Sequence, residues 1–251
     1  MMLVFDHVCV FYGDTPVLRE LSFQVRSGEQ VGLIGANGAG KSTLMKAALG
    51  LLPYTGSITV DGIPVTRKTL PEVRRKLGYV LQDADNQMFM PTVLDDMVFG
   101  PMNYGLSRTA AEQRAEETLA ELHMEYLRDR HNHKMSGGEK RMAAVATILA
   151  MQPQMLLMDE PFASLDFLTR GELQTQLLAI QPKLPRTIVL VTHQLEEALL
   201  LGQRILVMHP DSTIREFDLS ALPYPRDVEQ PALRALKSEI TDECRRPSTS
   251  A

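Results

Sequence analysis

Residues 35–43 have the composition and spacing of a loop that binds phosphate. They fit the pattern Gly-x-x-x-x-Gly-Lys-[Ser/Thr], in which glycines let backbone N–H groups turn towards phosphate oxygen atoms. A helix that follows such a loop adds the partial positive charge of its N-terminus. We expect Lys41 to reach the terminal phosphates of a nucleotide and Ser42 to bind Mg²⁺. The residues predicted to hold the nucleotide here are Gly35, Asn37, Gly38, Gly40, Lys41, Ser42 and Thr43.

The segments on either side of this loop have the hydrophobic patterns that such a loop requires. Val31, Leu33 and Ile34 are typical of a short buried strand that leads into it, and residues 44–49 are typical of a helix that leaves it. Gly50 then ends that helix. A strand, a glycine-rich loop and a helix in this order favour a phosphate site over a glycine-rich turn without function.

Two adjacent carboxylates form a second candidate site. Asp159 and Glu160 follow an apolar strand predicted over residues 155–158, which places them at the edge of a parallel sheet where open α/β folds bind ligands. Because successive side chains of a strand point in different directions, the two acids can take different roles. Asp159 suits coordination of Mg²⁺, and Glu160 suits polarisation of the water that attacks a γ-phosphate. The alternative is an acidic turn at the end of a strand.

A second anion-binding segment precedes a helix predicted to begin near Glu139. Ser136, Gly137 and Gly138 offer a hydroxyl and backbone N–H groups at a helix N-terminus, where the partial positive charge favours anions. One phosphate loop does not need a second site of this kind in the same chain.

The segment Met135-Ser-Gly-Gly-Glu resembles the Leu-Ser-Gly-Gly-Gln signature of the ABC transporter ATPase family. In that family two ATPase domains meet head to tail, and the signature of one covers the ATP on the phosphate loop of the other. The resemblance therefore implies that ATP and Mg²⁺ are bound and that Ser136, Gly137 and Gly138 contact ATP. It also implies a second ATPase subunit as partner, which we expect to be an identical chain.

Four further residues stand where this resemblance implies site residues. Tyr12 would stack on adenine, and Gln82 would sense Mg²⁺ and the attacking water. Asp166 would cross the dimer interface, and His193 would donate to the γ-phosphate and orient Glu160. Each has a structural alternative: Tyr12 in the core, Gln82 and Asp166 in turns, and His193 as a helix cap. The predicted catalytic residues are Glu160, His193 and Gln82, and the predicted Mg²⁺ ligands are Ser42, Gln82 and Asp159.

Residues 82–106 and the helix after the signature are similar to the ATPases of energy-coupling factor importers, particularly those for cobalt and nickel. This similarity implies a motor subunit at the cytoplasmic face of a membrane, bound to integral membrane transport subunits and driving cobalt or nickel uptake. We expect residues 83–104 to dock those subunits, because the segment is unusually apolar for a surface connection. The alternative is that these side chains pack a helical subdomain. The apolar residues concerned are Met88, Phe89, Met90, Val93, Val98 and Phe99.

Two other functions agree with the same motifs. The chain could power another ABC importer, for a vitamin or other small solute, or it could be a soluble ABC-type ATPase without a transport role. The soluble class usually carries two cassettes or a long coiled-coil insertion, and 251 residues with one copy of each motif hold neither. Transport is therefore favoured.

The helix after the signature departs from the family pattern at one position. Met142 stands where the family usually has arginine, which is expected to weaken packing around the helix. We expect the neighbouring Arg141 to replace it only with a rotated side chain.

Composition limits the remaining functions. The chain is 44% hydrophobic and 23% charged with a net charge of −5, which is typical of a globular protein and gives no broad basic surface for nucleic acid. No apolar run reaches the roughly 18 residues of a membrane-spanning helix. The N-terminus lacks the cationic start of a signal peptide and carries Asp6. With only Cys9 and Cys244, we expect a reduced cytosolic protein.

The order of predicted elements indicates an α/β fold. Short strands at 8–11, 21–25 and 57–60 predict an antiparallel β subdomain around the phosphate loop. Strands at 155–158, 187–191 and 204–207 alternate with helices, as in the parallel sheet of a P-loop NTPase core flanked by helices.

The helical pattern over residues 107–122, with Thr109 and Glu112 as a capping box, predicts an inserted α-helical subdomain at about 83–150. We predict an ATPase domain over residues 1–217 and a C-terminal extension over 218–251 with a short helix at 232–240 and a disordered end.

His123, His131 and His133 lie near the signature, but two histidines separated by one residue are a weak metal signal, so we expect structural or interface roles.

Overall fold

The computed structural model describes residues 2–163, 165–180, 186–222, 224, 226 and 230–245, which fall into two compact units. The first unit holds residues 1–76 and 187–251, and the second holds residues 77–186. The predicted disordered end, residues 246–251, lies outside the described residues. The predicted helical insertion at 83–150 falls within the second unit.

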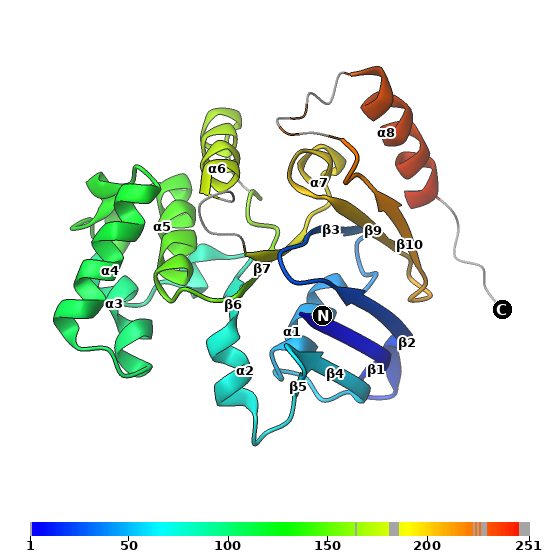
Figure 1. Ribbon diagram of the computed structural model, residues 1–251, viewed down its shortest axis with the longest axis horizontal. Helices are drawn as coiled ribbons and strands as arrows, with labels where there is room; N and C mark the ends of the chain where they lie inside the picture. Colours follow the sequence, from blue (N-terminus) through cyan, green and yellow to red (C-terminus); the bar gives the residue numbers. More distant parts are fainter. Residues whose placement is uncertain are drawn as a thin grey trace. The chain divides into compact units, whose positions relative to one another are not determined.

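The first unit contains two groups of paired strands (Figure 1). One is an antiparallel sheet with the order β2-β1-β4-β5. In the other, β3 lies between β8 and β9 and is parallel to both, and β10 pairs with β9 in the antiparallel direction. The elements are β1 Leu3–Tyr12, β2 Thr15–Val25, β3 Gln30–Gly35, α1 Lys41–Ala48, β4 Thr55–Val60, β5 Ile63–Pro64, α2 Leu70–Lys76, β8 Thr187–Val191, α7 Leu195–Leu201, β9 Arg204–Met208, β10 Ile214–Asp218 and α8 Pro231–Cys244.

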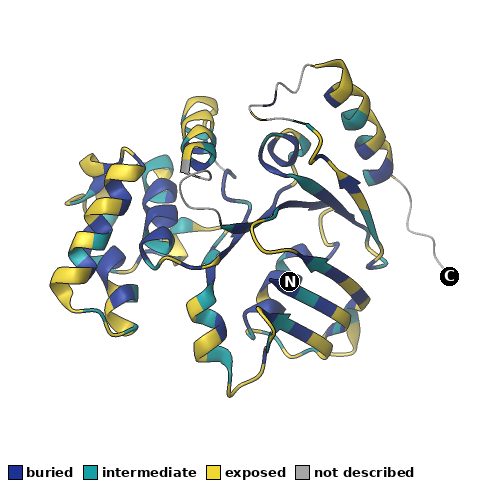
Figure 2. Cartoon of the chain, in the orientation of Figure 1, coloured by how far each residue is buried: buried dark blue, intermediate teal, exposed yellow. Residues whose placement is uncertain are grey.

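Burial differs between these strands in the way that their positions require. Buried and exposed residues alternate along β1 and β2, whose sheet has one face in the core (Figure 2). By contrast, every residue of β3 before Gly35 is buried, as in a parallel strand covered on both faces. The carboxyl end of this buried strand therefore delivers Gly35 to the start of the phosphate loop.

Among its described residues, the second unit contains the parallel strand pair β6 and β7 and four α-helices. The predicted capping box at Thr109 and Glu112 is wrong, because the hydroxyl of Ser107 accepts from the Ala110 N–H and caps the helix two residues earlier. The elements are β6 Leu77–Val80, α3 Val93–Asn103, α4 Arg108–Glu121, α5 Gly137–Ala150, β7 Met155–Asp159 and α6 Phe167–Ile180, with short 3₁₀ turns at Ala84–Asn86, Glu125–Leu127 and Asn132–Lys134. Parallel strands in both units and a separate antiparallel sheet confirm the predicted fold class.

The C-terminal helix α8 is part of the first unit. It runs from Pro231 to Cys244, longer than the helix predicted at 232–240, and buries Leu233 and Ile240 in a cluster with residues of β9 and α7. The carboxylate of Glu243, which is 5% exposed, lies 3.1 Å from Nε2 of His209 and accepts from Nη1 of Arg215 at 2.6 Å. These contacts attach the C-terminal extension to β10 and to the turn between β9 and β10.

Candidate nucleotide site

The predicted phosphate loop lies between β3 and α1 in the first unit. Gly38 and Gly40 have φ angles of +84° and +95°, a left-handed conformation that glycine adopts without strain. Gly40 caps α1 without a side-chain hydrogen bond, so no side chain of the cap covers the positive end of this helix. Such an N-terminus favours an anion.

The loop is packed tightly at its base and open at its tip. A Cβ atom on Gly35 would lie 2.2 Å from the carbonyl oxygen of Met208, and one on Gly40 would lie 2.6 Å from Leu18. A Cβ atom on Gly38 would have no heavy atom within 4 Å. A fixed base and an open tip fit a cradle for phosphate oxygen atoms.

Lys41 is turned back towards the start of its own loop. Its Nζ donates to the carbonyl oxygens of Gly35 at 2.9 Å and Ala36 at 3.0 Å, and 7% of the residue is exposed. Ser42 and Thr43 follow it in the first turn of α1. The ammonium group is thus held at the loop, where oxygen atoms of a phosphate can replace carbonyl oxygens as its acceptors.

Two other predicted residues of the first unit are exposed at the ends of their elements. Tyr12 ends β1 and is 50% exposed, so the alternative of a core aromatic is wrong. His193 follows β8 and is exposed, and the residue that caps α7 is Gln194. The roles of Tyr12 and His193 towards a nucleotide stay predictions.

A buried carboxylate that the sequence did not single out holds the segment before His193. Glu197 in α7 is 4% exposed and accepts a hydrogen bond from the hydroxyl of Thr192. The same hydroxyl accepts from the Gln194 N–H at 3.0 Å, and the Thr192 N–H donates to Leu33 at 3.2 Å. The signal in the sequence that could have found Glu197 is a charged residue inside the apolar pattern of α7.

In the second unit, Asp159 ends β7 and is 3% exposed. It accepts a hydrogen bond from the Tyr79 hydroxyl, 3.0 Å from Oδ2, across the pair of strands β6 and β7. Burial, and then the charge of Asp159, raise the pKa of Tyr79 well above its ordinary value, so the hydroxyl remains a donor. Sequence reasoning missed Tyr79 because β6 was not predicted.

Gln82 and Glu160 lie together in the second unit. Nε2 of Gln82 donates to Oε2 of Glu160 at 3.2 Å, and Glu160 directly follows Asp159. Glu160 has a φ of 46°, a left-handed conformation that is strained for a residue with a Cβ atom. Such strain occurs preferentially at functional sites. The structure therefore brings together two of the predicted catalytic residues beside a predicted Mg²⁺ ligand.

The signature segment begins α5 with a complete capping box. The Ser136 hydroxyl accepts from the Glu139 N–H at 3.2 Å, and the Glu139 carboxylate accepts from the Ser136 N–H at 2.8 Å. The Ser136 N–H lowers the pKa of Glu139. A Cβ atom on Gly137 would meet nothing within 4 Å, whereas one on Gly138 would lie 2.8 Å from Thr169. The helix thus starts two residues before Glu139, with an open approach at Gly137.

Asp166 stands at the start of α6 as a capping residue. Its Oδ1 accepts from the N–H groups of Leu168 and Thr169 at 3.0 and 3.1 Å, and its Oδ2 accepts from the Thr169 hydroxyl at 2.6 Å. These bonds lower the pKa of Asp166, the Thr169 hydroxyl most of all. Asp166 therefore has a structural role in its own chain, and its predicted role across a dimer interface is separate from it.

The predicted docking segment divides into buried and exposed residues. Met88, Val93 and Val98 are at most 8% exposed and pack the helical part of the second unit. For these three residues the alternative prediction, packing within a helical subdomain, is therefore correct. Phe89 and Phe99 are 65% and 41% exposed, and their rings meet edge to face with centroids 4.9 Å apart. Met90 is partly exposed. Of the six predicted apolar residues, Phe89 and Phe99 are therefore the two exposed ones that a partner can contact.

A buried polar frame holds the main chain under this aromatic pair. Oδ1 of Asp96 accepts from the N–H groups of Phe89 and Met90, both at 3.1 Å, and Nδ2 of Asn132 donates to Oδ2 of Asp96 at 2.7 Å. Burial raises the pKa of Asp96, while these hydrogen bonds lower it. The frame fixes the backbone from which Phe89 projects.

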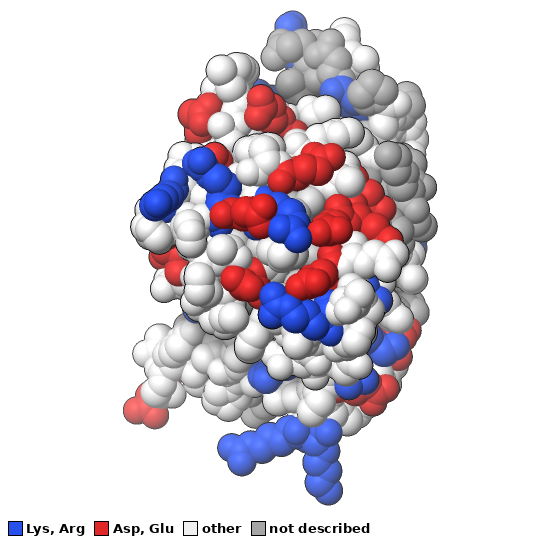
Figure 3. Space-filling model, turned by 90° about the vertical axis from the view of Figure 1, so that its left-hand side faces the viewer, with Lys and Arg blue, Asp and Glu red and all other residues white. Residues whose placement is uncertain are grey.

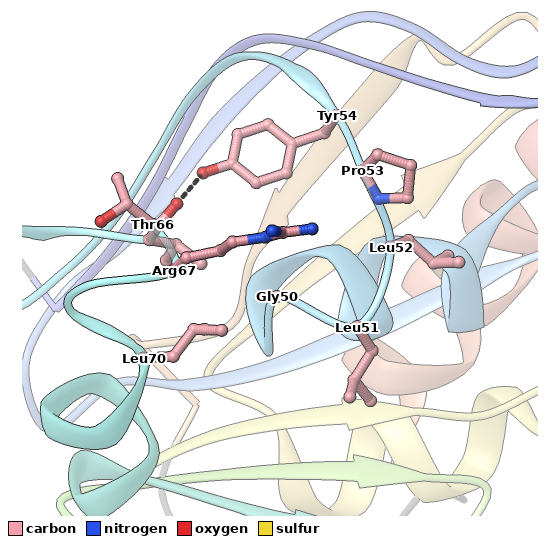
Figure 4. Close-up of a pocket in the computed structure, with 9 residues that line it drawn as sticks. Gly50, Leu51, Leu52, Pro53, Tyr54, Thr66, Arg67 and Leu70 are labelled. Atoms are coloured by element: carbon pink, nitrogen blue, oxygen red, sulfur yellow. Dashed lines mark hydrogen bonds between the residues drawn. The ribbon is translucent and has the colours of Figure 1, made fainter.

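Other surface features do not involve the predicted site residues. The face of the molecule in Figure 3 carries acidic and basic side chains close together. Arg108 pairs with Glu112, and Arg128 pairs with Glu116, in the second unit. In the first unit, residues 50–54, 65–67 and 70 line a pocket of about 580 Å³, in which Arg67 extends towards the segment that holds Pro53 (Figure 4).

Within the described residues, no helix is long and apolar enough to cross a membrane, and no three His, Cys, Asp or Glu residues form a group that could hold a metal ion.

Comparison with known proteins gives consistent matches along most of the chain. The family described as ABC transporter matches residues 18–163. The cobalt import ATP-binding protein CbiO of Rhodobacter capsulatus is 42% identical over 209 residues, which cover 82% of this chain and 74% of that protein. The energy-coupling factor transporter ATP-binding protein EcfA of Methanocaldococcus jannaschii is 38% identical over 205 residues, which cover 80% and 73%.

Solved structures agree with these matches. The structure of cbiO1 from Clostridium perfringens, part of the ABC transporter complex cbiONQ, has a TM-score of 0.81 and 30% identity over 97% of both chains. The ATP-binding cassette MJ0796, solved as a dimer in a post-hydrolysis state bound to ADP and Pi, has a TM-score of 0.77 and 27% identity over 87% of this chain and 99% of that one.

Proposed function

Because the chain belongs to the ABC transporter family and is one of its ATPases, we propose that it is the motor subunit of an energy-coupling factor importer for cobalt or nickel. Similarity to CbiO of Rhodobacter capsulatus and to EcfA supports the importer type, and the cobalt import role in the name of CbiO supports the cargo. The observation that carries the catalytic part is the hydrogen bond from Gln82 to Glu160 beside the buried Asp159.

In the proposed reaction, the oxygen of a water molecule attacks the γ-phosphorus of ATP, and the bond to the bridging oxygen breaks to release ADP and phosphate. Glu160 accepts the proton of the water, and Gln82 orients that water. Lys41 and the N–H groups of the phosphate loop stabilise negative charge on the phosphates. His193 donates to the γ-phosphate from the end of β8.

Mg²⁺ is assigned to Ser42, Gln82 and Asp159. Hydroxyl, amide and carboxylate oxygens are the hard donors that this ion prefers, so the donor set fits. When bound, the ion supplies positive charge that offsets the charge of the phosphates. The Tyr79 hydroxyl orients Asp159 for this role.

We further propose that two identical chains bind ATP together. Ser136, Gly137 and Gly138 of one chain cover the ATP on the phosphate loop of the other, Asp166 crosses the interface, and Tyr12 stacks on adenine. The open approach at Gly137 and the exposed ring of Tyr12 support this arrangement, as does the dimeric MJ0796 structure with ADP and Pi. Activity per chain should fall on dilution below the dimerisation constant, and constant activity would contradict the dimer.

The membrane partners are integral membrane transport subunits, and the chain binds them as a peripheral protein at the cytoplasmic face. We assign their contact to Phe89 and Phe99, because both are large exposed aromatic residues, the backbone of Phe89 is held by Asp96, and the ring of Phe99 contacts that of Phe89. Exposed aromatic side chains on a fixed backbone are typical of interface anchors. Nucleic acid is not among the proposed partners.

The ATPase assignment is tested with matched variants of the purified protein. Glu160→Gln keeps the shape and removes the base, so hydrolysis should fall by about 10²-fold or more while ATP still binds and the ATP-bound dimer persists. Lys41→Ala should lose ATP affinity instead. Glu125→Gln, an exposed carboxylate of the second unit, is the control and should hydrolyse ATP normally. Near-normal turnover by Glu160→Gln would reassign the base, with His193 the next candidate.

Docking and cargo are tested in the reconstituted membrane complex. Phe89→Asp and Phe99→Asp should leave ATP binding intact but reduce assembly and uptake of radiolabelled Co²⁺ or Ni²⁺. Tyr126→Asp changes another exposed aromatic residue, 58% exposed, and should reduce neither. Met88 is unsuitable for this test because it is buried, and a charge there would perturb folding. Intact assembly in both Phe variants removes the docking proposal. Uptake of a vitamin or other organic solute without Co²⁺ or Ni²⁺ by the unsubstituted complex removes the cargo proposal.

A further inference from the structure

A buried guanidinium group lies beside the proposed catalytic residues in the second unit. Arg141 belongs to α5, the helix that the signature begins, and 4% of it is exposed. It donates to the backbone carbonyl oxygens of Leu81 and Gln82, and Nη2 also donates to the carbonyl oxygen of Glu160 at 3.2 Å. One side chain of the signature helix therefore holds the main chain at both Gln82 and Glu160.

The chemistry of arginine suits this position better than that of any other side chain. Its five N–H donors lie in one plane and can serve several carbonyl groups at once, whereas the lysine ammonium is a single point. Burial lowers the pKa of Arg141, and the charges of Asp83, Asp159 and Glu160 oppose that shift. Arg141 thus supplies hydrogen-bond donors to three backbone carbonyl groups. Without it, these donors would have to come from water or from another segment of the chain.

The neighbouring Met142 does not take part in this contact. Met142 is 5% exposed and is an apolar core residue. The contact is thus made by Arg141, at the position next to the one where the family usually has arginine. From the sequence we expected Arg141 to replace the missing arginine at position 142 only with a rotated side chain. In the structure, the Arg141 side chain is directed at the backbone of Leu81 and Glu160.

We propose that Arg141 is a positioning residue for hydrolysis, which transmits the position of the signature helix to Gln82 and Glu160. The proposal rests on the roles proposed above for Gln82 and Glu160. When the signature at the start of α5 binds ATP, the Arg141 guanidinium keeps the backbone carbonyl groups of Gln82 and Glu160 at a fixed position relative to this helix. The side chains of Gln82 and Glu160 are then held at their hydrogen-bonding distance, 3.2 Å between Nε2 and Oε2.

The expected effect is on turnover and not on ATP binding. Arg141→Met keeps an unbranched side chain but removes the three hydrogen bonds, and loss of positioning by about 1 Å can lower the rate by about 10²-fold. We therefore expect kcat to fall by about 10- to 100-fold while KM for ATP changes by less than about threefold, because the phosphate loop belongs to the first unit. Arg141→Lys retains a charged donor and should restore part of the rate.

Lys140→Met is the matched control. Lys140 lies on the same turn of α5 and pairs with Asp85 on the exposed surface. This variant removes one positive charge and shortens one side chain of the same helix, so general effects of either change would appear in it. We expect its kcat to stay within about twofold of the unsubstituted protein, since exposed ion pairs contribute little.

Hydrogen exchange of the intact protein supplies a second measurement that does not depend on turnover. Arg141→Met should exchange faster in peptides that cover residues 81–83 and 160–163, with residues 143–150 of α5 unchanged. Faster exchange throughout α5, loss of folded protein in both Arg141 variants, or a parallel change of kcat and KM would show a merely structural role and overturn the proposal.

Glu160→Gln, assayed beside these variants, separates the two levels of inference. If Glu160→Gln is inactive and Arg141→Met turns over like the unsubstituted protein, the positioning proposal fails and the proposed function stands. If Glu160→Gln hydrolyses ATP normally, the assignment of the base fails, and with it the basis of the Arg141 proposal.

Discussion

Replacing Tyr79 with Phe isolates one hydrogen bond at the carboxylate that we assign to Mg²⁺. The Tyr79 hydroxyl lies 3.0 Å from Oδ2 of Asp159, and Asp159 is 3% exposed. Because a hydrogen bond to a charged group contributes about 1.5–3 kcal/mol, the free energy of unfolding should fall by that amount in the variant. For a chain of this length the melting temperature should fall by roughly 3–12 °C.

The same substitution should weaken Mg²⁺ binding, so that hydrolysis requires a higher Mg²⁺ concentration. Residues that orient a metal ligand typically contribute about 10- to 100-fold in metal affinity or activity. We therefore expect the Mg²⁺ concentration for half-maximal ATPase activity to rise by about 10- to 100-fold, with much of the rate recovered at saturating Mg²⁺. A titration of ATPase activity with Mg²⁺ at fixed ATP measures this shift.

Tyr54→Phe is the control for losing a tyrosine hydroxyl. Tyr54 donates to the carbonyl oxygen of Val65 at 2.6 Å in the first unit, so its removal should cost about 0.5–1.5 kcal/mol of stability and leave the Mg²⁺ dependence unchanged. An unchanged Mg²⁺ titration in Tyr79→Phe would refute the orienting role. An unchanged stability in both variants would refute the energies assigned to these hydrogen bonds.

Three further substitutions have expected outcomes. Ser136→Ala removes the hydroxyl of the capping box, so chemical denaturation should show a loss of about 1 kcal/mol, and ATPase activity should fall because the same hydroxyl is proposed to contact ATP. Thr192→Val removes the hydroxyl that donates to the buried Glu197, which should cost about 1–3 kcal/mol in urea unfolding and lower kcat by displacing His193. The Ser136 N–H lowers the pKa of Glu139, so this carboxylate stabilises the folded state above its ordinary pKa, and the contribution is lost as the pH falls through the lowered value. Glu139→Gln should therefore flatten the fall of thermal stability with acidification, and an unchanged slope would contradict the capping contact.

The sequence by itself determined those features whose parts are adjacent in the chain. The phosphate loop needs a strand, glycines at fixed spacing, Lys41 and a helix in succession, and all of these are local, so their pattern predicted the loop that the structure contains. The start of a helix near Glu139 was also predicted from a local pattern, and in the structure α5 begins at Gly137, where Ser136 and Glu139 form a capping box. The apolar patterns also predicted strands within β1, β2, β3, β4, β7, β8 and β9, because burial on one face or on both gives a strand a recognisable pattern, but they did not predict β5, β6 or β10.

Tertiary structure decided which distant groups meet and which apolar residues remain exposed. Tyr79 reaches Asp159 only because β6 pairs with β7, and Arg141 reaches Glu160 only because α5 packs beside both loops. No local pattern specifies such partners, since they depend on register and helix packing between segments separated by many residues. In the same way, Met88 and Phe89 are neighbours of similar hydrophobicity, yet one is buried and the other is 65% exposed. Asp96 fixes the backbone at Phe89 and Met90, and this contact depends on the fold of the whole segment rather than on the hydrophobicity of the side chains.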